Sequence, residues 1–172
     1  MTCKTTKNLE IIKITILLAS QHSLPPTRKC SGISWLIHGD LSKLEGFDAT
    51  TISPFKGTSA TEQPTNYKPV YVYNQGFKDR VLLSLIKILP YRVRKRWFFS
   101  SQPEKILRCI KVAWKARQFD ADIIISHVYP ALFRFATLFT GHKPKQIFYY
   151  HGSRLQELPE NQLSFLAHHC DG

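Results

Sequence analysis

Two histidines follow directly on short runs of residues that favour β-strands, where a side chain can meet a ligand. His127 comes after residues 122–126, and His151 comes after residues 146–150 and is followed by Gly152. A neutral imidazole donates or accepts a hydrogen bond, so it can hold a hydroxyl group, and glycine lets the chain turn away from a bound molecule. We expect at least one of the two histidines to contact a substrate, with Gly152 beside it. The alternative is that both are ordinary histidines at the rim of a sheet.

A loop between the first predicted strand and the first predicted helix contains Ser31 and Gly32 as candidate binding residues. The loop begins at Pro25 and ends at Gly32. Free backbone N–H groups and the helix dipole at such a position favour a phosphate or a sugar hydroxyl. The loop lacks the G-x-G-x-x-G spacing that close approach of a dinucleotide requires, so we expect no nicotinamide or flavin cofactor. An ordinary turn without a ligand is the alternative.

A strongly basic segment occupies the middle of the chain. The sequence has 24 Lys and Arg against 12 Asp and Glu, a formal charge of +12, and residues 78–117 hold twelve of the basic residues but two of the acidic ones. Around residue 95 the charges alternate with aromatic rings, a combination that suits an anionic membrane surface. A solvated helix face and an RNA-binding surface are the alternatives. The residues predicted to contact a membrane are Arg92, Arg94, Lys95, Arg96 and Trp97.

The cysteines and histidines form no pattern that predicts a metal site. Cys3, Cys30, Cys109 and Cys170 lie far apart, so neither a zinc framework nor a disulfide scaffold is indicated. The run from His168 to Asp171 contains ligand residue types, but adjacent residues cannot all face one ion. We therefore predict neither a metal nor a cofactor.

A parallel α/β sheet would position these candidate residues. Apolar runs alternate with stretches of helical periodicity, which implies right-handed crossovers and a ligand site at the carboxyl ends of the strands. The 172 residues suit one domain. We predict the strand order 3-2-1-4-5, with helices on both faces and a basic helical segment over residues 77–119. The first apolar run, residues 11–19, is too short to span a membrane.

The expected strands and helices follow from these runs. The predicted strands are residues 13–19, 47–53, 69–73, 122–127 and 146–150. Residues 81–89 fit either a core helix or a surface that inserts into lipid. The other predicted helices are residues 33–44, residues 130–140, and a helix capped by Ser101 and opened by Pro103 that buries Ile106, Ile110, Ala113 and Trp114.

Four segments, in their order and spacing, resemble the N-terminal, acceptor-side domain of family-4 glycosyltransferases of the GT-B fold. They are the first strand, the loop at residues 24–26, and the strand ends at residues 122–127 and 150–152. The likeness covers nearly the whole chain, and we assign residues 1–172 to this one domain. It implies a single Rossmann-like lobe that takes part in sugar transfer from a nucleotide-sugar to a glycan or lipid-linked acceptor. In this family the reaction usually proceeds with retention and without a metal, in envelope or exopolysaccharide synthesis.

The resemblance also implies residue roles and a location. His151 matches the family's strand-end histidine near the acceptor and the transferred sugar, so it is the expected catalytic residue. Ser31 and Gly32 fall where the family has a pair of glycines. The family's donor-binding lobe has no counterpart in the sequence, so we expect nucleotide-sugar binding only with a second lobe. The family implies the inner, cytoplasmic face of the cell membrane. A glycan-binding module without catalysis and a basic RNA-binding module are the alternatives.

Overall fold

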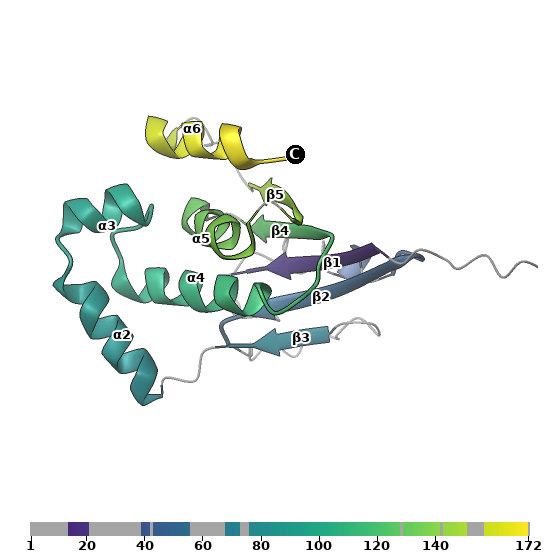
Figure 1. Ribbon diagram of the computed structural model, residues 1–172, viewed down its shortest axis with the longest axis horizontal. Coiled ribbons are helices and arrows are strands. Elements are labelled where there is room, and N and C mark those ends of the chain that lie inside the picture. The colour runs from purple at the N-terminus through teal and green to yellow at the C-terminus, as the bar shows by residue number, and fades with distance from the viewer. Residues whose placement is uncertain are drawn as a thin grey trace, which may run out of the picture.

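The central strands consist of β-branched and aliphatic residues because both of their faces are covered. Leu17, Leu18 and Ala19 are fully buried. Five strands form one parallel sheet in the order β3-β2-β1-β4-β5 (Figure 1), which confirms the predicted fold class and strand order. The strands are β1 (Ile14–Ala19), β2 (Phe47–Ser53), β3 (Lys68–Tyr71), β4 (Ile123–His127) and β5 (Lys145–Tyr149). This computed structural model describes residues 14–20, 39–41, 43–55, 68–72, 76–127, 129–141, 143–150 and 157–171.

The parallel register brings the carboxyl ends of the strands to one edge of the sheet. Ala19 of β1 pairs with Ile52 of β2 on one side and with Ser126 of β4 on the other. His127, the last residue of β4, pairs with Tyr149 of β5. In an open parallel sheet this edge is where ligands bind.

Helices α4 (Pro103–Ala116) and α5 (Pro130–Thr140) pack together over one face of the sheet (Figure 1). The main core lies beneath them, with Ile106, Leu132 and Ile124 among its fully or nearly fully buried side chains. A smaller cluster on the other face includes Leu41, which belongs to the helical residues 39–41. Most of the helix predicted over residues 33–44 lies outside the described residues.

The start and the buried face of α4 differ from the sequence prediction. Gln102, and not Ser101, is the N-cap residue of α4, and no side chain bonds to the free N–H groups there. Pro103 occupies the first turn as predicted, a position where its missing N–H costs nothing. Trp114 is half exposed because the helix instead buries a face that includes Leu107, Cys109, Val112 and Ala116.

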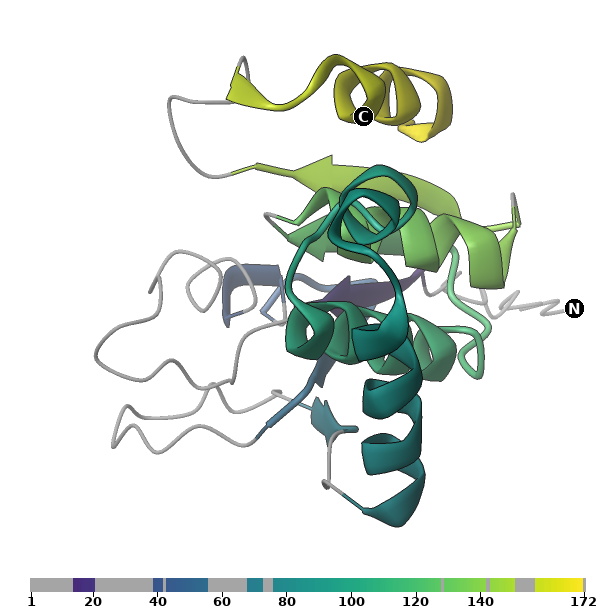
Figure 2. The same ribbon diagram turned by 90° about the vertical axis from the view of Figure 1, so that its left-hand side faces the viewer.

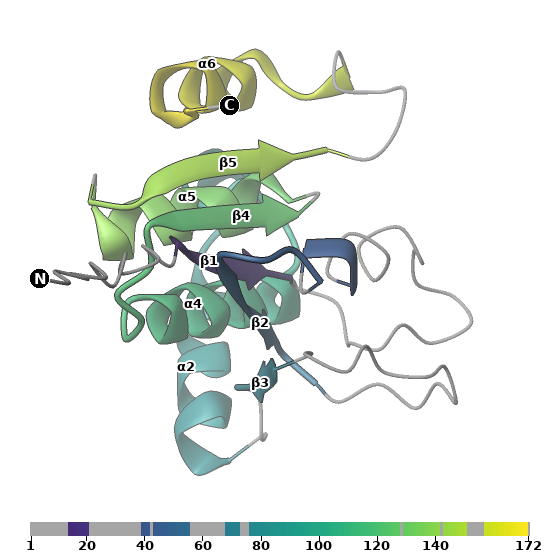
Figure 3. The same ribbon diagram turned by 90° about the vertical axis from the view of Figure 1, so that its right-hand side faces the viewer.

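Helix α6 (Glu160–His169) shields the outer edge of the sheet beside β5, as Figures 1 and 3 show. Directly after the helix, the backbone N–H of Asp171 donates to the carbonyl of Gln146 at 2.7 Å. The N–H of Gln146 donates in turn to the Asp171 carboxylate, also at 2.7 Å. These bonds occupy backbone groups of an edge strand that could otherwise pair with another chain.

Helices α2 (Phe77–Ile88) and α3 (Tyr91–Trp97) form a corner beyond the carboxyl ends of the strands (Figures 1 and 2). A part-buried ion pair fastens α2 to α4: both carboxylate oxygens of Asp79 lie 2.8 Å from Nζ of Lys111. None of the helices in the described part of the chain is long and apolar enough to cross a membrane.

Candidate functional site

The structure describes one of the five predicted ligand residues, and the other four lie outside the described residues. His127 lies at the carboxyl end of β4, where the sequence predicted it, with 2% of its surface exposed and its ring 5.6 Å from that of Tyr149. Its side chain is therefore packed into the sheet edge and does not project from it. Ser31, Gly32, His151 and Gly152 lie outside the described residues. Their roles stay predictions.

The structure gives Arg94 a set of backbone contacts that the sequence did not predict. Its guanidinium does not point to solvent, because Nη1 donates to the carbonyls of Leu89 at 2.5 Å and Lys87 at 3.1 Å at the end of α2. Nε donates to the carbonyl of Ser101 at 3.0 Å. Carbonyls in the last turn of a helix have no partner within the helix, and a cation also complements the dipole there. Arg94 therefore connects α2, α3 and the segment that leads into α4.

The other four residues predicted to contact a membrane are exposed on α3. They are Arg92, Lys95, Arg96 and Trp97. Trp97 keeps 59% of its surface exposed, although a large aromatic side chain is costly to leave in water. Three of the four basic residues predicted to contact a membrane, together with Trp97, are therefore accessible on α3, and their contact with a membrane stays a prediction.

An apolar stripe lies along α2. Phe77, Val81, Leu85 and Ile88 recur at helical spacing, and Phe77 and Ile88 are 81% and 78% exposed. Single exposed apolar residues are common, but a continuous row of four on one helix is not. The interpretation of this segment as a simple core helix is therefore incomplete, because Ile86 and Asp79 are buried on the opposite side.

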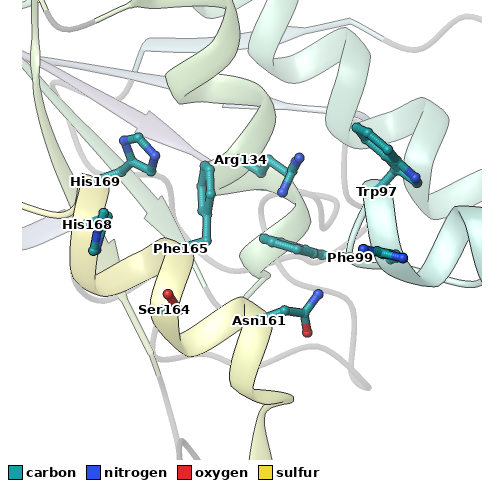
Figure 4. A pocket seen from close by; sticks show the side chains of 9 residues that line it. Trp97, Phe99, Arg134, Asn161, Ser164, Phe165, His168 and His169 are labelled. Atoms are coloured by element: carbon teal, nitrogen blue, oxygen red, sulfur yellow. The ribbon is translucent and has the colours of Figure 1, made fainter.

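A hollow of about 380 Å³ lies between α3, α5 and α6, and Figure 4 shows its side chains. Arg134 of α5 is one of the residues that line it. The guanidinium carbon lies 4.6 Å from the ring centroid of Phe99 and 4.9 Å from that of Phe165. We call this hollow the Arg134 pocket. Arg96, Trp97, His168 and His169 also line it.

Phe99 has an unusual backbone conformation at this pocket. Its φ of 54° is left-handed, the one positive value among the described residues other than glycine. A bulky residue in this region carries strain, and such strain collects at functional sites. The conformation directs a nearly buried ring against both Arg134 and Phe165, whose ring centroid is 5.4 Å from that of Phe99.

Two further hollows adjoin the Arg134 pocket. One of about 470 Å³ shares Arg96 and Asn161 with it, and one of about 280 Å³ shares Phe99 with it and extends to Tyr129, just beyond the end of β4. We call the three together the basic groove. None of the described residues that line the groove is Asp or Glu. Its cationic residues are Arg92, Lys95, Arg96, Lys105 and Arg134.

The groove offers a ligand positive charge, aromatic surface and neutral hydrogen-bonding groups. Nζ of Lys105 lies 5.3 Å from the ring centroid of Tyr129, so charge and ring surface also meet at the strand edge. In the described part of the chain, no group of His, Cys, Asp or Glu side chains is arranged to hold a metal ion. The arrangement suits an anion that carries a ring or a hydroxylated body.

Sequence reasoning missed Arg134. The residue stands alone among apolar residues in α5, PALFRFATLFT, so no charge run marks it. A single arginine within an otherwise apolar helix is itself a signal, because a charge is rarely placed there without a specific environment. Phe99 and Phe165, which provide that environment, come from distant parts of the sequence and could not be paired from spacing.

Comparisons with known proteins give a distant structural likeness and no match in sequence. The chain matches no family model and no curated protein sequence. It is similar to a solved structure described as the N-terminal domain of trehalose-6-phosphate phosphatase from Candida albicans, with a TM-score of 0.46 and 15% identity. The alignment covers 88% of this chain and 37% of that chain, so this chain spans well under two thirds of its length.

Proposed function

We propose that the chain is the acceptor-binding lobe of a glycosyltransferase resembling family 4, and that it binds a glycan or lipid-linked acceptor at an anionic membrane surface. The nucleotide-sugar donor would be bound with a second lobe. The observation that carries the proposal is the joint position of the apolar stripe and the basic groove beyond the carboxyl ends of the strands.

The apolar stripe supports membrane docking more than a solvated face. Exposed side chains such as Phe77, Leu85 and Ile88 gain free energy when they leave water for the boundary between headgroups and acyl chains. Helix α2 has twelve residues, a length for lying in the interface and not for spanning it. The stripe therefore distinguishes this surface from an ordinary charged helix face.

The charges of α3 would add to this attraction. Each Lys or Arg near an anionic leaflet contributes about 1 kcal/mol, and Arg92, Lys95 and Arg96 are all exposed. Arg94 is excluded from this sum because its guanidinium is bonded to carbonyls. We expect the attraction to weaken as salt is added.

The RNA-binding alternative accounts for less of the surface. Arginine and aromatic side chains can both hold single-stranded RNA. A stripe of aliphatic residues along α2 has no such use, since it offers neither charge nor, beyond Phe77, a ring for base stacking. Membrane association accounts for both features at once.

Sedimentation with lipid vesicles tests the docking surface. The wild-type chain should bind vesicles rich in an anionic phospholipid and bind neutral vesicles much less. Replacing Leu85 and Ile88 by serine should weaken anionic binding by roughly tenfold, because about 1.5 kcal/mol or more of apolar burial is lost. Replacing Arg92, Lys95 and Arg96 by serine should weaken it by at least as much.

Leu138→Ser is the matched control, since Leu138 is 62% exposed but lies on α5, outside the apolar stripe, and is not among the residues that line the basic groove. It should leave vesicle binding unchanged. Equal binding of the wild-type chain to neutral and anionic vesicles would contradict the proposed docking surface. So would a loss of vesicle binding in Leu138→Ser as large as that in the α2 and α3 variants. Vesicles that contain a lipid-linked glycan should bind more tightly than plain anionic vesicles if the acceptor part of the proposal holds.

A further inference from the structure

We propose that the Arg134 pocket is a binding site for a phosphate ester, with Arg134 as the residue that anchors it. The proposal of a phosphate site rests on the arrangement of side chains from α3, α5 and α6. That the phosphate belongs to the sugar acceptor rests on the proposed function.

The two rings hold Arg134 in place before any ligand arrives. Phe99 and Phe165 lie near its guanidinium, with centroids at 4.6 and 4.9 Å from the guanidinium carbon and 5.4 Å from each other, and Figure 4 shows Arg134 beside both rings. A guanidinium that stacks on rings keeps its N–H donors at its edge, where they can meet two oxygens of one phosphate. Fixing the side chain in advance lowers the entropy that binding would otherwise cost.

The surroundings of Arg134 favour an anion. Arg96, His168 and His169 line the same pocket, and none of its described lining residues is acidic. Asn161 and Ser164 add neutral donors from α6. Burial lowers the pKa of Arg134, the direction expected for a cation that is partly removed from water. A bound anion would offset that cost.

The aromatic walls indicate what the phosphate carries. Trp97 lines the pocket with more than half of its surface exposed, next to the more buried Phe99 and Phe165. An exposed indole offers a flat apolar face for the body of a ligand whose charged end lies at Arg134. The chemistry is that of an organic phosphate, from either a free sugar phosphate or a lipid with a phosphate headgroup.

Calorimetric titration tests the site, with a hexose 1-phosphate as the probe in solution and vesicles that contain phosphatidic acid as the lipid probe. We expect the wild-type chain to bind at least one of them. Arg134→Gln should weaken that binding at least tenfold, as expected for loss of a bidentate charged contact. The affinity of Arg134→Lys should fall between those of the wild type and Arg134→Gln, because lysine keeps the positive charge but lacks the paired N–H donors of a guanidinium.

Arg117→Gln is the matched control. Arg117 also stacks on a ring, with its guanidinium carbon 5.4 Å from the Trp114 centroid, but it lies at the end of α4 and outside the pocket. If Arg134→Gln fails to fold, Ser164→Glu provides a second variant, since Ser164 is exposed and a carboxylate there should repel a phosphate. Melting temperatures establish which variants are folded.

The outcomes separate this site from the proposed function. Hexose phosphate binding that depends on Arg134 supports a soluble ligand, and lipid binding that depends on Arg134 supports a headgroup. Binding of hexose phosphate that survives Leu85→Ser and Ile88→Ser, while vesicle binding is lost, would show that pocket and docking surface act separately. The site is overturned if neither probe binds, or if Arg134→Gln and Arg117→Gln have equal effects.

Discussion

Nη1 of Arg94 donates to the carbonyl oxygen of Leu89 across 2.5 Å, and this bond closes the corner between α2 and α3. The same side chain reaches the carbonyls of Lys87 and Ser101. Arg94 thereby sets the position of α3 relative to α2, and with it the relation between the basic groove and the apolar stripe.

Replacing Arg94 by glutamine should destabilise the chain. Hydrogen bonds to a charged group contribute about 1.5 to 3 kcal/mol, so the free energy of unfolding should fall by about that amount and the melting temperature by several degrees. Arg92→Gln is the control, because Arg92 is exposed on the same helix. Denaturant titration of both variants measures the difference. Equal free energies of unfolding for the two variants would show that the hydrogen bonds from Arg94 to the carbonyls add no net stability.

The ion pair between Asp79 and Lys111 should be costly to break on one side. Asp79→Ala leaves the ammonium of Lys111 in a largely buried position, where its side chain is 22% exposed, so we expect a loss of roughly 2 to 4 kcal/mol in unfolding free energy. A double variant with Asp79→Leu and Lys111→Met should recover most of this loss, because it removes both charges. A double variant less stable than Asp79→Ala would contradict this explanation.

Cys109 should be unreactive in the folded chain. Burial raises the pKa of its thiol to about 12, and the nearby charges of Lys105 and Arg108 offset this in part. A thiol reagent at pH 8 should therefore modify Cys109 only after denaturant is added, because the thiolate is the reactive form. Mass spectrometry of the peptide that contains Cys109 measures the labelling. Rapid labelling without denaturant would show that the thiol is accessible.

The raised pKa of Cys109 makes the free energy of unfolding fall as the pH rises above the ordinary pKa of the thiol. The thiol's ordinary pKa is 9.0, so above that pH the unfolded chain loses a proton that the folded chain keeps until about pH 12. The contribution to stability is complete below pH 9 and is lost between pH 9 and 12, by up to about 1.4 kcal/mol per pH unit. Wild type should therefore lose stability relative to Cys109→Ala between pH 8 and 10. A constant difference between the two would contradict the shift.

The sheet could be predicted from sequence because its signals are local. Continuous apolar runs mark β1 and β4, and their alternation with helical stretches indicates a parallel sheet, as observed. Gly141 and Pro144 correctly marked the end of α5. The environment of each charge could not be predicted in this way. Nothing in the run from Arg92 to Arg96 indicates which guanidinium turns back onto the carbonyls of α2.

The sequence predicted a ligand site at the carboxyl edge of the sheet but not the residues that line the Arg134 pocket. The carboxyl edge of the sheet followed from the topology, and helices α2 and α3 of the basic segment lie beyond that edge, whereas α4 covers a face of the sheet. The Arg134 pocket depends on three helices that meet only in the folded chain, and on a left-handed Phe99 that no sequence pattern marks. Contacts of this kind follow from packing and not from residue spacing.

The role of His151 remains a prediction that binding can test. A strand-end imidazole that bonds a sugar hydroxyl should contribute about 1 kcal/mol, so His151→Ala should weaken glycan binding roughly fivefold with little change in melting temperature. His127→Ala should instead lower the melting temperature, because His127 is buried against Tyr149. A large loss of stability in His151→Ala, parallel to its loss of binding, would make it a structural residue.

Affinity for a lipid-linked glycan phosphate in nanodiscs tests the central claim most directly. Two nanodiscs of equal negative charge are compared, one with the glycan-bearing lipid and one with anionic phospholipid alone, together with a single-stranded RNA as a competitor. An acceptor-binding lobe should bind the glycan nanodisc at least about tenfold more tightly than the plain one, and RNA should compete weakly. Equal affinity for the two nanodiscs, or displacement from both by RNA, would contradict the account.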